Sequence, residues 1–180
     1  MKIFIASDIH GSYLYCKKMI EAFERENASK MLLLGDILYH GPRNDLPDGY
    51  DPKSVIELLN KYSSSILCVR GNCDTEVDQM VLKFPLMADY CVIAHNDRII
   101  YATHGHIFNM DNLPPIQSGD ILLCGHTHVP AWTEAGDKYY LNPGSVSIPK
   151  EGSCHGYMIL DDNGFTWKDL DGNEYHSLCI

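Results

Sequence analysis

Side chains that can bind a metal ion follow almost every apolar run of this sequence. Aspartate, asparagine and histidine supply oxygen and imidazole ligands, which suit first-row divalent ions such as manganese, iron and zinc. Because the carboxyl ends of strands in an α/β sheet meet at one crevice, we expect these residues to share one site. The runs are Asp8-Ile9-His10-Gly11, Gly35-Asp36, Gly71-Asn72, Thr103-His104-Gly105-His106 and Gly125-His126-Thr127-His128.

Two of these runs alternate ligand and non-ligand residues, as Asp8-x-His10 and His126-x-His128. Residues two apart in extended backbone project to the same side, so each pair is expected to clasp one ion. Glycine next to the ligands, as at positions 11, 35, 71, 105 and 125, permits tight turns. Taken singly, aspartate or histidine at a strand end often only forms a turn or a cap. The joint pattern favours a metal site.

The first half of the chain has the pattern expected of elements that position these runs. Residues 2–7, 31–34 and 65–69 are short apolar strands, each followed by one of the runs. Residues 12–26 carry apolar side chains at helical spacing. A second helix is predicted from residue 51 to about residue 62, with Asp51 as N-cap and Pro52 in the first helical position. A short third helix is predicted over residues 76–82.

Strands dominate the second half of the chain. Residues 90–103 predict a hairpin, and further strands are predicted at residues 120–124, 131–134, 138–141, 157–160 and 165–170. A βαβαβ half followed by a β-rich half predicts an α/β fold of two packed sheets flanked by helices. The chain has 180 residues and shows no internal repeat or linker, so residues 1–180 are expected to form one domain.

Composition restricts the class of partner. The formal net charge of -10 argues against a broad basic surface for nucleic acid or anionic lipid. Bound divalent cations can still make a carboxylate-rich site attractive to a small anionic substrate. Seven cysteines without a CxxC pair are expected to be reduced thiols in a cytoplasmic protein. The N-terminal apolar run is too short for a signal peptide, and no segment is long enough to span a bilayer.

Taken together, the runs resemble the motif set of the calcineurin-like metallophosphoesterases, and their order and loop lengths are similar to those of the small YfcE-type phosphodiesterases in that family. The resemblance covers essentially the whole chain. It implies a four-layer αββα sandwich of two mixed β-sheets flanked by helices, and self-association as a dimer or tetramer. It also implies two divalent ions per chain, with manganese favoured and zinc, iron, nickel or magnesium as alternatives. The implied ligands are Asp8, His10, Asp36 and His128 for one ion and Asp36, Asn72, His104 and His126 for the other, with the Asp36 carboxylate bridging.

Cys73 stands where the family pattern usually has a histidine that protonates the leaving oxygen. A thiol with a pKa of about 8.5 is a poor acid for this step, so we expect activated aryl esters to be hydrolysed faster than alkyl esters. Inert packing is the alternative role for Cys73, and capping of the following helix is the favoured interpretation of Asp74. The candidate catalytic residues are Asn72, His104, Cys73 and Asp74.

In the implied reaction, two ions about 3.5 to 4 Å apart lower the pKa of a bridging water, and the resulting hydroxide attacks phosphorus in line. Tyr39 and Tyr50 are candidates for stacking on an aryl group or a nucleobase. Arg43 could pair with a phosphate oxygen, although a solvated loop charge is its default interpretation, and Asn142 could simply close a turn before Pro143. The candidate substrate contacts are His106, His40, Arg43 and Asn142.

The sequence thus predicts a metal-dependent phosphoesterase that hydrolyses small phosphodiesters. A phosphomonoesterase of the same fold is one alternative, and a non-catalytic scaffold resembling a retromer subunit is another. The complete set of candidate ligands favours an enzyme over a scaffold. A nuclease acting on long DNA or RNA is disfavoured by the acidic balance. The expected partners are a small phosphoester and further copies of the chain, without long nucleic acid or a membrane.

Overall fold

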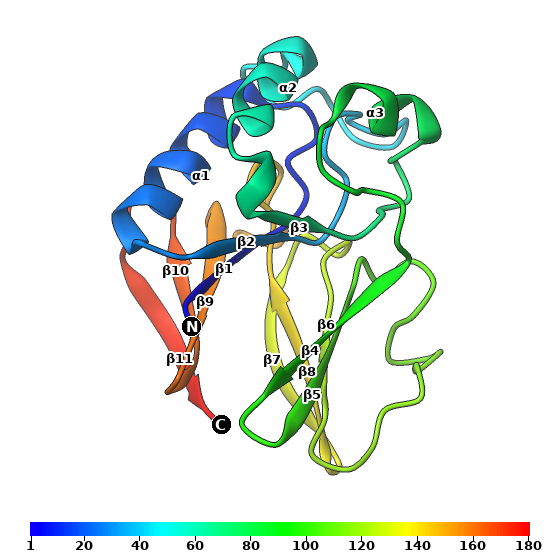
Figure 1. Cartoon of the computed structure of the whole chain (residues 1–180), viewed down its shortest axis with the longest axis vertical. Coiled ribbons are helices and arrows are strands. Elements are labelled where there is room, and N and C mark those ends of the chain that lie inside the picture. The colour runs from blue at the N-terminus through cyan, green and yellow to red at the C-terminus, as the bar shows by residue number, and fades with distance from the viewer.

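Two mixed β-sheets lie face to face at the centre of the molecule, as the computed structural model in Figure 1 shows. The structure describes residues 1–180, apart from the side chain of Ala135. The six-stranded sheet has the order β11-β10-β9-β1-β2-β3. Its strands are β1 (Ile3–Ala6), β2 (Lys30–Leu33), β3 (Ile66–Cys68), β9 (Gly156–Asp161), β10 (Gly164–Asp169) and β11 (Glu174–Cys179).

The five-stranded sheet has the order β4-β5-β6-β8-β7. Its strands are β4 (Tyr90–His95), β5 (Arg98–Thr103), β6 (Ile121–Leu123), β7 (Pro130–Ala135) and β8 (Lys138–Pro143). Strands β1, β2 and β3 run parallel in the first sheet, and β5 and β6 run parallel in the second. All five therefore deliver the loops that follow them to a common edge of their sheet.

The helices begin where the sequence predicts. In α1 (Tyr13–Glu26), the Ser12 side chain caps the first turn by accepting the N–H of Tyr15. Asp51 caps α2 (Pro52–Asn60), which has proline in its first turn. The short α3 (Glu76–Val81) begins after Thr75, whose backbone N–H donates to the Asp78 carboxylate at 2.7 Å. A 3-10 turn, η1 (Ser63–Ser65), leads into β3.

Each face of the first sheet covers a separate hydrophobic core, as strand alternation requires. Phe4 and Met31 point toward α1 and α2 and belong to the core beneath those helices. Their strand neighbours Ile5 and Leu32 point the other way, into the core shared with the second sheet. Trp167 of β10 fills that second core and is fully buried. The shared core fixes the two sheets against each other.

The predicted pair of mixed sheets is confirmed, but the flanking layers are unequal. The helices lie above the first sheet (Figure 1), whereas residues 104–120, which contain no helix in the described structure, run along the outer face of the second. Tyr101 of β5 donates from its hydroxyl to the Pro115 carbonyl of this segment at 3.3 Å. Loop therefore takes the place of the expected helical fourth layer. Strand β11 was not predicted from the sequence. Among the described residues, no helix is both long and apolar enough for a membrane span.

Candidate metal centre

The candidate ligands lie in loops that follow strands β1, β2, β3, β5 and β6, at the edge where the two sheets meet. Backbone hydrogen bonds hold these loops to one another. Within the first sheet, the N–H of Asp8 donates to the Gly35 carbonyl at 3.2 Å and the N–H of His10 donates to the Asp36 carbonyl at 2.9 Å. Between the sheets, the N–H of His126 donates to Asp8 Oδ2 at 3.1 Å. The first sheet and the second sheet thus share one site.

The ligand backbones are left-handed rather than extended. Such φ values are uncommon outside glycine and carry a free-energy cost. Five candidate ligands adopt them: Asp8 at 59°, His10 at 47°, Asp36 at 56°, His126 at 69° and His128 at 62°. The expectation that alternating residues converge because their backbone is extended was therefore wrong. Tight turns direct these side chains instead.

One group of ligand atoms gathers around Asp8. His128 Nε2 lies 3.2 Å from Asp8 Oδ1 and 3.2 Å from His10 Nε2. His10 Nε2 lies 3.6 Å from Asp8 Oδ1. These three buried side chains bring their ligand atoms within 4.8 Å of one another, which is a spacing that a single bound ion can span.

A second group gathers around His104. Its Nε2 lies 3.1 Å from Asn72 Oδ1 and 3.2 Å from His126 Nδ1. His126 and His128 therefore belong to different groups, and the expectation that this pair clasps one ion was wrong. Asp36 joins the groups, because its Oδ2 lies 3.5 Å from both His10 Nε2 and His104 Nε2.

The protonation of the rings shows that this cluster has a surplus of hydrogen-bond acceptors. A backbone carbonyl can only accept, so a ring nitrogen facing one must carry a proton, and in the neutral form of the ring the other nitrogen presents a lone pair. Three rings donate Nδ1–H to a carbonyl 2.7 Å away: His10 to Tyr39, His104 to Leu34 and His128 to Ile148. When these rings are neutral, as metal binding requires, their Nε2 lone pairs face each other and the carboxylates. Such a set of donor atoms fits a divalent cation.

The electrostatics agree with that fit. Burial raises the pKa of Asp8, but hydrogen bonds from His10 and His128 in their protonated forms outweigh it and hold this pKa well below the ordinary value. Burial lowers the pKa of His104, but the hydrogen bond to Asp36 and the nearby carboxylate charges raise it to about 9. When the two rings are neutral, Asp8 Oδ1 is buried without a hydrogen-bond donor among the described residues. The cluster therefore attracts positive charge, as protons or as metal ions.

Two glycines allow the ligands to approach so closely. A Cβ at position 71 would overlap the Asp36 carboxylate and backbone nitrogen, and a Cβ at position 125 would overlap the Ser7 hydroxyl and crowd Asp8. Larger residues at either position would push a ligand loop outward. Glycine at these two positions is therefore required by packing.

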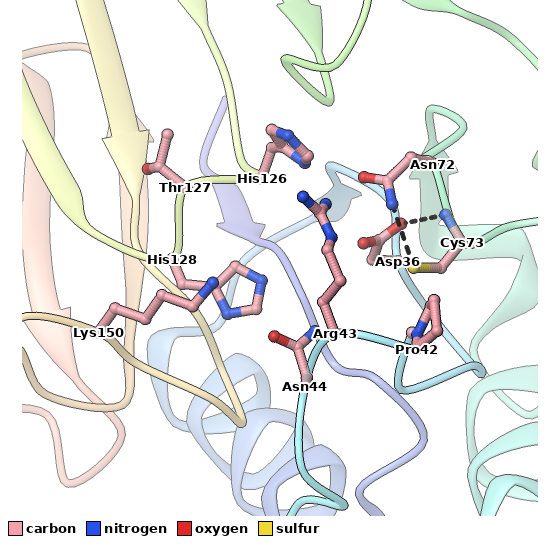
Figure 2. A pocket seen from close by; sticks show the side chains of 11 residues that line it. Asp36, Pro42, Arg43, Asn44, Asn72, Cys73, His126, Thr127, His128 and Lys150 are labelled. Atoms are coloured by element: carbon pink, nitrogen blue, oxygen red, sulfur yellow. Dashed lines mark hydrogen bonds between the residues drawn. The ribbon is translucent and has the colours of Figure 1, made fainter.

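A pocket of about 380 Å³ opens above the cluster. Its floor includes Asp36, Asn72, His126 and His128, and its walls are formed by Gly41, Pro42, Arg43, Asn44, Cys73, Thr127 and Lys150. Figure 2 shows the Arg43 side chain extending from the loop after β2 into this space, with Lys150 on the side of His128. Lys150 was not identified from the sequence.

Comparison with known proteins agrees with the geometry. Residues 1–164 match the family model described as the calcineurin-like phosphoesterase superfamily domain. The chain belongs to this superfamily. It is 45% identical over 163 residues to phosphodiesterase YfcE of Escherichia coli K12, covering 91% of this chain and 89% of the relative. Phosphodiesterase MJ0936 of Methanocaldococcus jannaschii is 26% identical over 189 residues, covering 100% of this chain and 99% of the relative.

Two solved structures show the same fold. The structure of YfcE, described as a phosphoesterase from E. coli, matches with a TM-score of 0.96 and 42% identity, covering 100% of both chains. Vps29 from Entamoeba histolytica matches with a TM-score of 0.58 and 21% identity, covering 93% of this chain and 90% of that chain. The latter likeness concerns the fold alone.

Within this superfamily site, Asp74 acts on the backbone. Its Oδ2 accepts the N–H groups of Asp36 at 2.8 Å and Gly71 at 2.7 Å, and its Oδ1 accepts the N–H of Ile37 at 2.9 Å. It thereby ties the loop after β2 to the loop after β3. The interpretation of Asp74 as the helix cap was wrong, because Thr75 is the N-cap of α3. Burial raises the pKa of Asp74 to about 6.

Cys73 lines the pocket beside the ligands of this superfamily site. Its backbone N–H donates to Asp36 Oδ1 at 2.8 Å, and the Asn72 amide donates to its sulfur at 3.2 Å, as the dashed lines in Figure 2 show. Burial and the neighbouring Asp36 charge raise the pKa of the thiol. A proton held this firmly is poorly available to a leaving oxygen.

The other candidate substrate contacts lie outside the pocket lining. The Asn142 side chain donates to the Gly125 carbonyl at 2.7 Å and accepts the N–H of Gly144 at 2.8 Å. Asn142 is completely buried, so its turn-forming interpretation is confirmed and a substrate contact is wrong. His106 packs against His104 with ring centroids 5.3 Å apart, and burial lowers the pKa of His106 to about 4.

The tyrosines of the loop after β2 do not present a stacking platform in the pocket. His40 packs edge-on between Tyr39 and Tyr50, with centroid distances of 4.8 and 5.4 Å. None of these three rings belongs to the described pocket lining. Stacking of a substrate on Tyr39 or Tyr50, as the sequence suggested, is therefore not supported by this arrangement.

Proposed function

We propose that this chain hydrolyses small phosphodiesters with two divalent metal ions, manganese being favoured. Asp8, His10 and His128 would hold one ion, Asn72, His104 and His126 would hold the other, and Asp36 would contribute to both. The single observation that carries this assignment is the position of Asp36 Oδ2, 3.5 Å from a ring nitrogen of each group. Membership of the phosphoesterase superfamily and the likeness to named phosphodiesterases support the activity.

Bound divalent ions supply Lewis-acid chemistry, since they lower the pKa of water and neutralise charge on phosphoryl oxygens. The chain's own residues prepare the site for that chemistry. Carbonyl groups fix the imidazole rings with their lone pairs inward, and Asp74 fixes the spacing of the Asp36 and Asn72 loops. Arg43 and Lys150 stand at the pocket wall, where they add positive charge that favours an anionic substrate.

The Cys73 environment supports a preference for diesters with good leaving groups. A buried thiol of raised pKa gives little assistance to a departing alkoxide. Substrates whose leaving group is already stable as an anion depend least on such assistance. The chain is therefore expected to turn over aryl diesters faster than alkyl diesters.

Turnover of bis(p-nitrophenyl) phosphate and p-nitrophenyl phosphate by protein loaded with manganese tests the proposal. We expect metal-dependent release of p-nitrophenol from both, with the larger kcat/KM for the diester. Asp36→Asn is the blank, and Asp45→Asn, in the same loop but outside the pocket lining, is the matched control. A larger kcat/KM for the monoester would assign the alternative phosphomonoesterase function.

A protein scaffold is the second candidate, because the fold is shared with Vps29. Convergence of seven ligand side chains in one cluster favours the enzyme, since a scaffold has no use for a surplus of buried acceptors. Titration of the purified protein with manganese separates the candidates. Absence of binding, together with unchanged properties of Asp36→Asn, would establish the scaffold.

We also propose that the chain is a single-domain, cytoplasmic homo-oligomer, either a dimer or a tetramer. The core shared by the two sheets supports one domain, and the seven free cysteines fit a reducing compartment. Leu67 of edge strand β3 and Val92 of edge strand β4 are both exposed beside an apolar groove, which offers a surface for self-association. Light scattering on the eluted protein measures the assembly, and a monomer at all concentrations would contradict it.

A further inference from the structure

The pocket carries two cations that the metal cluster does not use. Arg43 differs from the other arginines of the chain, each of which has a partner in the protein. Arg25 donates to the Leu170 carbonyl at 3.0 Å, Arg70 pairs with Asp89 at 2.6 Å, and Arg98 donates to the Gly119 carbonyl at 2.6 Å. No hydrogen bond or ion pair occupies the Arg43 guanidinium among the described residues, and the side chain extends into the pocket (Figure 2).

Lys150 approaches the same pocket from the other side of the site. Its backbone N–H donates to the His128 carbonyl at 3.1 Å, and its carbonyl accepts the Ser153 hydroxyl at 2.7 Å. The backbone of Lys150 is therefore fixed to a ligand loop, while its side chain is exposed and forms no ion pair within the described part of the chain. Two loops, far apart in the sequence, each place an unpaired cation at one pocket.

The charge and the lining residues of this pocket restrict which ligands can bind in it. A phosphodiester carries a single negative charge, which the proposed metal ions already neutralise. Arg43 and Lys150 then remain as uncompensated positive charges on the walls. The rest of the described wall is small or polar, namely Gly41, Pro42, Asn44, Cys73 and Thr127, without an aromatic ring. Recognition beyond the scissile phosphate is therefore electrostatic, without stacking.

From this arrangement we infer that the natural substrate is a small phosphodiester bearing a second anionic group, a carboxylate or a phosphate, on one of its two alcohols. Arg43 and Lys150 bind that group and determine specificity. The inference rests on the proposed phosphodiesterase function and adds the substrate class. Guanidinium binds either anion in a bidentate manner, while ammonium acts as a point charge.

Diesters that share one leaving group but differ in the second alcohol test whether the pocket recognises an anionic group on that alcohol. Each substrate carries p-nitrophenol on one side and ethanol, a 2-carboxyethyl group, a 2-phosphonoethyl group or choline on the other. With manganese-loaded wild type we expect kcat/KM for each anionic ester to exceed that of the ethyl ester by about tenfold, the worth of one charged hydrogen bond. The choline ester falls below the ethyl ester. The carboxylate and phosphonate arms show which anion is preferred.

The variants Arg43→Met and Lys150→Met should each move the anionic-to-ethyl ratio toward one, mainly through KM. Lys83→Met is the matched control, because Lys83 is an exposed cation away from this pocket and its removal changes the net charge equally. A ratio that survives in Lys83→Met and collapses in Lys150→Met supports local recognition. An equal fall in both variants would assign the effect to the overall field and overturn the inference.

The wild-type series alone also decides the matter, independently of how the variants fold. If wild type hydrolyses the ethyl ester readily and its kcat/KM is the same for the anionic esters, the inference is overturned. The phosphodiesterase function would then still stand. Failure to hydrolyse any ester of the series with added divalent ions would overturn the proposed function, and the inference with it. In the supporting case, the ratio declines with added salt because exposed cations are screened.

Discussion

Two buried clusters of ionisable groups lie in this molecule, and they differ in how their acceptors are used. On the helix-covered side of the first sheet, Glu26 accepts from Lys2 at 2.7 Å and from Lys168 and Tyr157 at 2.8 Å. Burial raises the pKa of Glu26, but these three donors outweigh it and lower the pKa to about 2. Every charge in this cluster has its partner.

In the cluster at the sheet edge, hydrogen-bond acceptors outnumber the donors available to them. Its carboxylates and inward-facing ring nitrogens accept, and the donors of His10, His104 and His128 are spent on backbone carbonyls. A buried polar network is stable only when each member is satisfied. A carboxylate whose donors are all within the protein, such as Glu26, stabilises the fold, whereas a surplus of hydrogen-bond acceptors marks a place where a cation can bind.

Replacing a carboxylate in each cluster should have opposite effects. Asp36→Asn is expected to lower kcat/KM at least about hundredfold and to reduce the metal content measured by elemental analysis. Above the His104 pKa of about 9, where that ring is neutral, its metal-free form should unfold at the same or a higher urea concentration than wild type, because an acceptor has been removed from a cluster of acceptors. A metal-free variant much less stable than wild type would show that the Asp36 carboxylate stabilises the fold as Glu26 does, and would contradict the surplus of acceptors.

Gly71→Ala tests how closely the surplus acceptors are packed. The added Cβ overlaps the Asp36 carboxylate, so we expect a loss of about 2 kcal/mol or more in the free energy of unfolding, with loss of metal binding. Gly136→Ala is the reference for backbone strain alone, because its Cβ meets no described atom within 4 Å although its φ of 69° is left-handed. Urea unfolding of both variants gives the measurement, and equal losses would show that the ligand loop can move aside.

Glu26→Gln removes the charge from the saturated cluster. We expect the free energy of unfolding to fall by about 1 to 3 kcal/mol, while kcat/KM of the folded enzyme changes less than about twofold, within the usual effect of a site outside the chemistry. Chemical denaturation and turnover on the same preparation provide both numbers. A large loss of turnover would mean that the two clusters are coupled.

Glu26 also makes the free energy of unfolding depend on pH, with a sign that follows from its lowered pKa. The pKa of Glu26 is lower in the folded protein than its ordinary value of 4.5. The charged carboxylate therefore stabilises the folded protein above that pH, and this contribution is lost as the pH falls toward 2. The difference in unfolding free energy between wild type and Glu26→Gln should therefore shrink from about pH 5 to about pH 3. A constant difference across this range would contradict the lowered pKa.

Cys73→Ser should have the smallest effect of the series. The hydroxyl is no better placed than the thiol to give up a proton, so turnover of an aryl diester should change by less than about threefold. Comparison of aryl and alkyl diesters sharpens the test. A loss confined to alkyl diesters would show that the thiol does assist the leaving group.

Much of this architecture follows from local sequence patterns. The cap at Asp51 and the apolar runs of β1 and β2 are encoded within a few residues, and the structure has them where predicted. Strand β11 escaped prediction because residues 174–179 are mostly polar and partly exposed, without the apolar run that marks a strand.

Other features depend on contacts between distant residues. Lys150 reaches the pocket because its loop is tied to His128, and sequence spacing does not reveal such a tie. The three N–H groups bound by Asp74 come from two loops, so only the folded backbone shows its role. The split of His126 from His128 follows from turns at left-handed residues, which alternation along a strand does not predict.

The tie that Asp74 makes between the loops after β2 and β3 has a consequence for metal exchange. Since its partners are backbone N–H groups, these three hydrogen bonds do not themselves require a bound ion. Cations can then enter and leave a frame that keeps its shape, as in a preformed receptor. Loading of the proposed ions would then require no refolding of these two loops.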